Sequence, residues 1–200
     1  TLTLVAAKWK GFWVGGINLR FKHRNTKNFN FNKSWITKEN ALELYNDGLK
    51  KIHEKKLDLF SIDLDGNDIY ILEELLKNVE QPSVIIAEYN SKFFPPLSFK
   101  IKYDPNHVWK VDDYLGASLT EFVKLLDKHS YKLVCCNSGT GANAFFVKNK
   151  FADKFNDVPT DINKIYVEAR YQLLSETGNG HKQSIKTIER LFEQLEEFNS

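Results

Sequence analysis

Runs of apolar residues alternate with polar turns along this chain, and one stretch shows the pattern most clearly. Residues 57–64 form a compact apolar run of the length and make-up of a buried strand. Residues 65–68, Asp-Gly-Asn-Asp, then give a turn signal, because Gly66 tolerates a positive φ and Asn or Asp can cap a helix. Apolar residues next recur at helical spacing, at Ile69, Leu72, Leu75, Leu76 and Val79. The stretch therefore predicts a strand, an acidic turn and a helix.

The same patterns predict a regular alternation of elements over most of the chain. The expected strands cover residues 11–17, 29–36, 57–64, 83–89, 131–137 and 142–148. The expected helices cover residues 1–8 (the tail of a helix), 41–53 and 69–79, and one that begins at the capping-box pattern of residues 118–121. Further helical stripes run through residues 162–169 and 185–195. This order predicts an open α/β sheet, mostly parallel, with an antiparallel hairpin at its C-terminal end.

Composition and charge narrow the class of protein. An apolar content of 42% with 27% charged residues is ordinary globular composition, and a net charge of +2 argues against a nucleic-acid or membrane surface. No apolar run reaches the roughly 18 residues that a membrane-spanning helix needs, and the amino end lacks a signal-peptide layout. Cys135 and Cys136 are neighbours, which disfavours a disulfide between them and suggests buried thiols in a reducing compartment. We therefore expect a cytoplasmic protein.

The sequence starts inside an apolar segment and contains no methionine, not even at position 1. We expect a further N-terminal piece of the protein to lie outside it.

Polar side chains stand at the ends of two predicted strands. Asp63 lies near the end of one apolar run and Asp65 directly follows that run, and Glu88 and Asn90 close the next. In open α/β sheets, ligands bind outside the carboxyl ends of the strands. The alternative is that the two aspartates only cap the following helix and complement its dipole.

Residues 91–116 form a long irregular connection that is rich in aromatic residues and proline. Such a length inside a compact domain is uncommon unless it is functional. A flap over a binding site and a cover over the core are equally good interpretations.

Several short motifs occur together in one order along the chain. They lie at residues 62–68, 88–90, 103–109, 113–118 and 143–147, and the tail motif at residues 180–184 fits the same pattern. Together they resemble one set of FkbM-like methyltransferases, enzymes of the class I fold that use S-adenosylmethionine. The resemblance implies a three-layer Rossmann-like domain over residues 1–150, with a C-terminal helical extension over residues 151–200 packed on it.

The resemblance also implies where the cofactor would bind. The family's first strand, with its glycine-rich turn, is absent from this sequence, and the family's second strand would end at Gly16 without the usual acid. Gly16, Asn18, Asn40 and Asp63 are the cofactor-binding residues that it implies here.

If this fold is right, the strands that end at Asp63 and Glu88 are neighbours, about 4.8 Å apart. Asp65 or Glu88 is then the expected base that takes the proton of the acceptor hydroxyl, with Asn90 orienting the acceptor. His107 is a second candidate base, although a lone loop histidine is more often simply solvated. We assign no metal ligands; a divalent cation on the same oxygens is a less favoured alternative, and a calcium loop is rejected because Gly66 falls at the wrong position.

Two functions remain open at this point. The first is an O-methyltransferase that acts on a hydroxyl of a small molecule, such as a sugar or glycan precursor. The second is a degenerate relative that binds a ligand or a protein partner without catalysis. Under either function, the C-terminal helices could form a homodimer.

Overall fold

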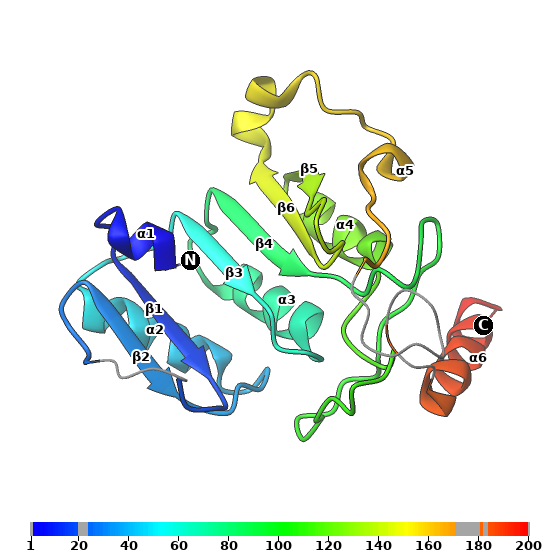
Figure 1. Cartoon of the computed structure of the whole chain (residues 1–200), viewed down its shortest axis with the longest axis horizontal. Coiled ribbons are helices and arrows are strands. Elements are labelled where there is room, and N and C mark those ends of the chain that lie inside the picture. The colour runs from blue at the N-terminus through cyan, green and yellow to red at the C-terminus, as the bar shows by residue number, and fades with distance from the viewer. Residues whose placement is uncertain (1, 20–23, 171–180, 182–183, 200) are drawn as a thin grey trace.

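A computed structural model describes residues 2–19, 24–170, 181 and 184–199. Its elements appear in the predicted order (Figure 1). They are α1 (Leu2–Ala6), β1 (Gly11–Gly15), β2 (Phe29–Lys33), α2 (Ala41–Ile52), β3 (Leu59–Ile62), α3 (Asp68–Asn78), β4 (Val84–Glu88), α4 (Leu119–Lys128), β5 (Tyr131–Cys136), β6 (Asn143–Lys148), the 3₁₀ segment η1 (Asn149–Phe155), α5 (Ile162–Ile165) and α6 (Ile185–Asn199). The α/β class is confirmed.

The strands form two sheets, whereas the sequence predicted one. β1 and β2 make a parallel pair, and the other four strands follow the order β3-β4-β6-β5. β3 and β4 are parallel, whereas β6 runs antiparallel to both of its neighbours. The predicted C-terminal hairpin is therefore present, and its second strand lies between β4 and β5. β1 and β3 face each other, and none of the described strands lies between them (Figure 1).

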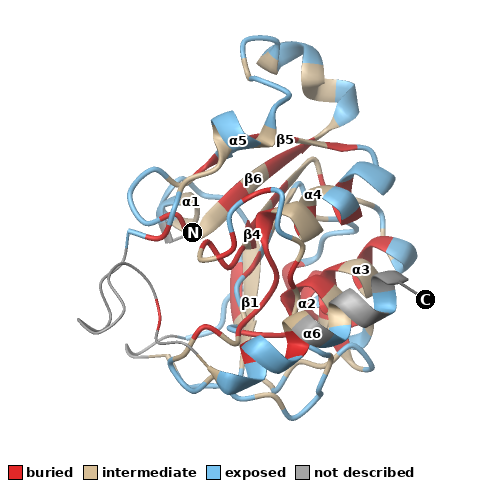
Figure 2. Cartoon of the chain, turned by 90° about the vertical axis from the view of Figure 1, so that its right-hand side faces the viewer, coloured by how far each residue is buried: buried red, intermediate tan, exposed pale blue. Residues whose placement is uncertain are grey.

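The core lies where helices cover the four-stranded sheet (Figure 2). β4 and β6 contribute Ile85 and Phe146, and α3 and α4 contribute Leu72 and Phe122, all fully buried. A central strand such as β4 must be apolar on both faces, which explains its aliphatic sequence. Burying these side chains stabilises the fold by roughly 1.5–3 kcal/mol each.

The long connection of residues 91–116 packs against α6. Phe93, Phe99 and Ile101 form a second small core, which Leu191 of α6 contacts. Arg190 Nε donates to the Lys100 carbonyl at 3.2 Å. Residues 93–101 of the connection are thus packed and held by the C-terminal helix.

Three local expectations were wrong. Ser118 stands at the N-cap position of α4 as predicted, but its side chain makes no capping hydrogen bond; its hydroxyl accepts from the Phe99 amide at 3.1 Å. The helix predicted over residues 162–169 ends at Ile165, because the following backbone is held extended: Val167 O accepts from the Tyr89 hydroxyl at 2.6 Å. Cys136 is buried as expected, but Cys135 is exposed.

Gly141 docks the β5–β6 turn onto this extended segment. Its φ is +69°, and a Cβ atom there would lie 2.1 Å from the Glu168 carbonyl oxygen. We expect Gly141→Ala to lower the free energy of unfolding by about 1–3 kcal/mol. Gly139→Ala in the same turn is the control, since its Cβ would meet only the Asn137 side chain, at 3.2 Å. Urea denaturation compares the two variants, and equal losses would contradict the assigned cause.

Candidate functional site

The turn after β3 is built around a buried carboxylate. Asp68 is 1% exposed, and it accepts hydrogen bonds from the Leu64 amide at 2.7 Å and the Gly66 amide at 2.9 Å. Burial raises the pKa of Asp68 to about 6. The turn also holds Asp65 at a φ of +55°, a left-handed conformation that is uncommon for residues with a Cβ. Asp68 thus stabilises the turn, whereas the side chains of Asp63 and Asp65 are exposed at the surface.

Three carboxylates meet at the carboxyl end of the parallel pair β3 and β4. The register pairs Ile62 with Ala87, so the residues that follow each of them, Asp63 and Glu88, come together. One carboxylate oxygen from each of Asp63, Asp65 and Glu88 lies within 4.8 Å of the others. The structure therefore brings together three residues that the sequence singled out.

The closeness of the three carboxyl groups and their burial raise their pKa values. Burial, followed by the charges of Asp63 and its neighbours, raises the pKa of Glu88 to about 9. Partial desolvation also raises the pKa of Asp63 and Asp65, although both residues remain exposed overall. Asp63 and Glu88 are hydrogen-bonded to each other. At neutral pH the Glu88 carboxyl group consequently holds a proton.

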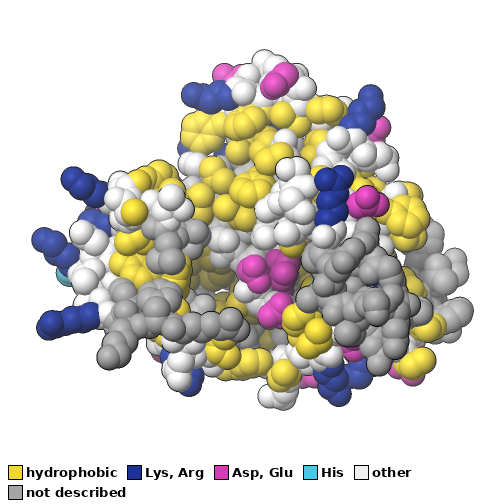
Figure 3. All heavy atoms as spheres, viewed as in Figure 1, with side chains coloured by type: hydrophobic (Ala, Val, Ile, Leu, Met, Phe, Trp, Pro, Cys, Tyr) yellow, Lys and Arg dark blue, Asp and Glu magenta, His cyan; other side chains and the backbone are white. Residues whose placement is uncertain are grey.

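A cavity of about 490 Å³ opens beside the three acids. Acidic side chains gather near the middle of this face of the molecule, next to a hollow (Figure 3). The cavity's other walls include polar residues of the β5–β6 hairpin and several aromatic rings. These lining residues include Asn137, Thr140, Asn143, Trp109 and His181.

His181 and Trp109 come from distant parts of the chain. Their rings meet edge to face with centroids 4.7 Å apart. Burial lowers the pKa of His181, which favours the neutral imidazole. The His181 carbonyl accepts from Lys92 Nζ at 3.1 Å, and Lys92 is also ion-paired at 2.8 Å with Asp113, a carboxylate that is almost fully buried. We had not assigned either ring to the site; their only signal in the sequence was their place in the motifs that carry the family resemblance.

Two other predicted catalytic residues do not line this cavity. Asn90 is 1% exposed, and its amide donates to the Asp113 and Leu115 carbonyls at 2.9 and 3.1 Å. His107 packs over Gly66, where a Cβ atom would lie 2.4 Å from the histidine ring. Both residues support the loops around the acids.

The residues expected to bind the cofactor lie mostly away from the three acids. Gly16 packs on the Trp35 ring, and Asn40 Nδ2 donates to the Trp35 carbonyl at 2.9 Å. Asn18 is exposed after β1. Only Asp63 of the expected set lines the acidic cavity.

None of the helices in the described part of the chain combines the length and the apolar character that a bilayer crossing requires. Comparison of the chain with family models, with curated proteins and with solved structures gives no match.

Proposed function

We propose that this protein is an S-adenosylmethionine-dependent O-methyltransferase that acts on a hydroxyl of a small molecule, such as a sugar or glycan precursor. The observation that carries the proposal is the cluster of Asp63, Asp65 and Glu88 at the carboxyl edge of two parallel strands, where open α/β sheets bind ligands. The position of the antiparallel β6 between β4 and β5 supports it too, since it suits the class I methyltransferase sheet that the sequence resembles.

The charge of the cluster suits such a cofactor. S-adenosylmethionine supplies an activated methyl group on a sulfonium cation. The acidic side chains of Asp63 and Asp65 line the cavity, and a carboxylate attracts a cation strongly at a partly desolvated site. Asp63 is the residue that we expect nearest to the cofactor.

The pKa pattern separates the roles of the acids. Glu88 is protonated at neutral pH because its pKa is raised to about 9, so it cannot accept another proton. Burial and the neighbouring Asp63 raise the pKa of Asp65, which makes its carboxylate a better base. We therefore assign to Asp65 the removal of the acceptor's proton, and to Glu88 a hydrogen bond that orients Asp63.

The remaining walls suit a polyhydroxylated acceptor. Asn137, Thr140 and Asn143 offer amide and hydroxyl groups, and Trp109 offers an apolar ring on which a sugar can stack.

Calorimetric titration of S-adenosylmethionine against the folded protein tests the cofactor assignment directly. We expect saturable heat, and we expect the Asp65→Asn variant still to give saturable heat, with a weaker affinity because one acidic group is lost. Transfer of a labelled methyl group into a mixture of nucleotide sugars should fall by about 10²–10⁴-fold in Asp65→Asn. Asp157→Asn, an exposed change outside the cavity, is the control. Absence of heat, or full transfer by Asp65→Asn, would count against the proposal.

One observation favours the second candidate function, a binding protein without catalysis. β1 ends at Gly15, and in the sequence no aspartate or glutamate that could hold a ribose follows it before Glu39. A protein that binds nucleotide sugars but gives no heat with S-adenosylmethionine would fit this second function.

A further inference from the structure

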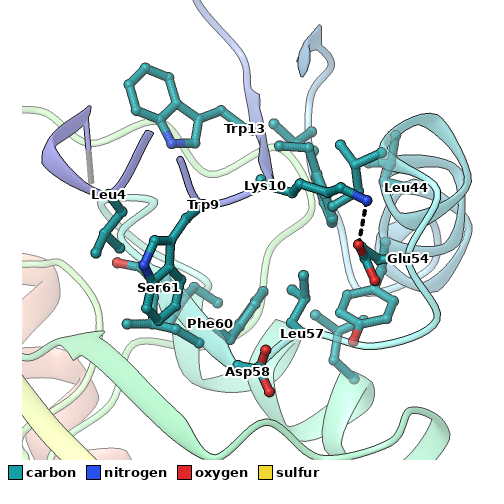
Figure 4. Close-up of a pocket in the computed structure, with 18 of the residues that line it drawn as sticks. Leu4, Trp9, Lys10, Trp13, Leu44, Glu54, Leu57, Asp58, Phe60 and Ser61 are labelled. Carbon is teal, nitrogen blue, oxygen red and sulfur yellow. Dashed lines mark hydrogen bonds and ion pairs between the residues drawn. The ribbon is translucent and has the colours of Figure 1, made fainter. Parts of the chain in front are cut away.

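The turn that carries Asp65 lies where two cavities of different chemistry meet. One of them, about 630 Å³ in volume, lies between β1 and β3. Figure 4 shows the apolar side chains around it, among them Leu4, Leu57 and Phe60. Asp63 lines both this cavity and the acidic cavity, whereas Asp65 lines only the acidic one. The direction of the Asp65 side chain therefore decides whether its carboxylate reaches a ligand in the acidic cavity.

The backbone of Asp65 does not favour this direction by itself. Its φ is +55°, and a residue with a Cβ atom keeps this left-handed conformation only where its surroundings impose it. Asp68 supplies one restraint, since its carboxylate accepts from the Gly66 amide at 2.9 Å. The long connection of residues 91–116 supplies another.

This other restraint is the ring of His107. A Cβ atom at Gly66 would lie 2.4 Å from the Cδ2 atom of the ring, so only a glycine lets the ring pack this closely on the turn. The backbone carbonyl of Asp65 also contacts the ring. The His107 ring thus packs against the backbone of residues 65 and 66.

Hydrogen bonds anchor residues 104–107 on the same turn. The Asp104 carbonyl accepts from Asn67 Nδ2 at 2.7 Å and from the His107 amide at 2.9 Å. The Pro105 carbonyl accepts from Trp35 Nε1 at 2.7 Å. Because these bonds fix the backbone that carries His107, its ring cannot withdraw from Gly66 without breaking them.

We propose that His107 is the positioning residue of Asp65: its ring, packed on Gly66, keeps the Asp65 carboxylate turned into the acidic cavity. The inference rests on the proposed function for the reaction that Asp65 serves, but not for the placement of Asp65. It also replaces the role of a base that the sequence suggested for His107, since the His107 side chain does not line the acidic cavity.

The ring acts through its shape rather than through its charge. Burial lowers the pKa of His107, which favours the neutral imidazole, and the nearby charges of Asp104 and Asp112 oppose that of Lys186. The Nε2 atom is buried and has no hydrogen-bond partner among the described residues. A phenylalanine, which has a flat ring of similar size, should therefore position Asp65 nearly as well.

Titration of the Asp65 carboxyl group by ¹³C NMR tests the proposal without cofactor or turnover. In His107→Ala we expect the measured pKa of Asp65 to fall by at least about 0.5, because a released turn exposes the carboxylate to water and moves it away from Asp63. His107→Phe should keep the wild-type value to within about 0.2. Val108→Ala, an exposed neighbour in the same loop, is the matched control and should leave the titration unchanged.

Gly66→Ala is a second arm that also serves if His107→Ala fails to fold. Its new Cβ atom displaces the ring, so the pKa of Asp65 should fall as in His107→Ala, and the double variant should show no further fall. An unchanged pKa in either single variant would overturn the proposal. Equal falls in His107→Phe and His107→Ala would also overturn it.

Kinetics separate this inference from the proposed function. In a methyl-transfer assay, kcat of His107→Ala should fall by about 10–100-fold while KM for the acceptor changes by less than about threefold, because a displaced base slows the chemical step. A raised KM with an unchanged kcat would contradict the positioning role. The expected Asp65 titrations in a protein that transfers no methyl group would support the positioning role and count only against the proposed function.

Discussion

Replacement of Glu88 by glutamine is expected to stabilise the protein by an amount that grows with pH. The pKa of Glu88 is raised to about 9 in the folded state, against roughly 4.3 in an unfolded chain. The stability that this shift contributes is complete below about pH 4 and is lost as the pH rises toward the folded pKa. Glutamine resembles the protonated acid and does not titrate, so the variant avoids this loss.

The quantity to measure is the change with pH of the difference in the free energy of unfolding between Glu88→Gln and wild type. The free energies of unfolding of wild type and Glu88→Gln should diverge by up to about 1.4 kcal/mol per pH unit between about pH 5 and pH 7. Urea denaturation over this range measures the divergence. Glu43→Gln, on the exposed side of α2, is the control and should run parallel to wild type. A constant difference between wild type and Glu88→Gln would show that Glu88 titrates normally.

Removal of the Asp68 carboxylate is expected to cost about 2–4 kcal/mol in the free energy of unfolding. Asp68→Ala leaves the Leu64 and Gly66 amides without their acceptor, and each unsatisfied buried group costs about 1–3 kcal/mol. Asp68→Asn keeps one acceptor oxygen and should lose about half as much. Denaturation of both variants beside wild type measures the losses.

The pH dependence of this loss has a definite sign. Burial raises the folded pKa of Asp68 to about 6, so its contribution is largest at acidic pH and declines up to about pH 6. The cost of Asp68→Ala should therefore be larger near pH 4 than near pH 7. Asp157→Ala, an exposed aspartate, should show a change of no more than about 0.5 kcal/mol. A loss of that small size for Asp68→Ala would mean that the carboxylate does not support the turn.

Hydrophobic pattern predicted the order of elements well, because burial of a strand or helix face is recorded in neighbouring residues. The pattern gave wrong local predictions where a side chain or a backbone segment forms hydrogen bonds with residues far away in the sequence. Ser118 has a capping sequence, yet its hydroxyl accepts from Phe99, 19 positions earlier in the chain. The segment after Ile165 has helical spacing, but pairing of Arg170 N with Thr140 O keeps the chain extended there.

Part of the candidate site was predictable because the hydrophobic pattern locates the strands that carry it. Asp63, Asp65 and Glu88 follow strands whose adjacency comes from the alternation of strands and helices, so topology alone brings them together. Asn90 has the same position in the pattern, but the carbonyls of Asp113 and Leu115 occupy its amide. His181 reaches the cavity from the C-terminal region through tertiary packing, which no local pattern records.

The central claim is that Glu88 is protonated at neutral pH and hydrogen-bonded to Asp63 at the junction of β3 and β4. Infrared difference spectroscopy of wild type against Glu88→Gln at about pH 7 tests it most directly. We expect the carbonyl band of a protonated carboxyl group in wild type, its loss on replacement of Glu88, and its disappearance as the pH approaches about 10. A wild-type spectrum with only ionised carboxylates at about pH 7 would contradict the claim.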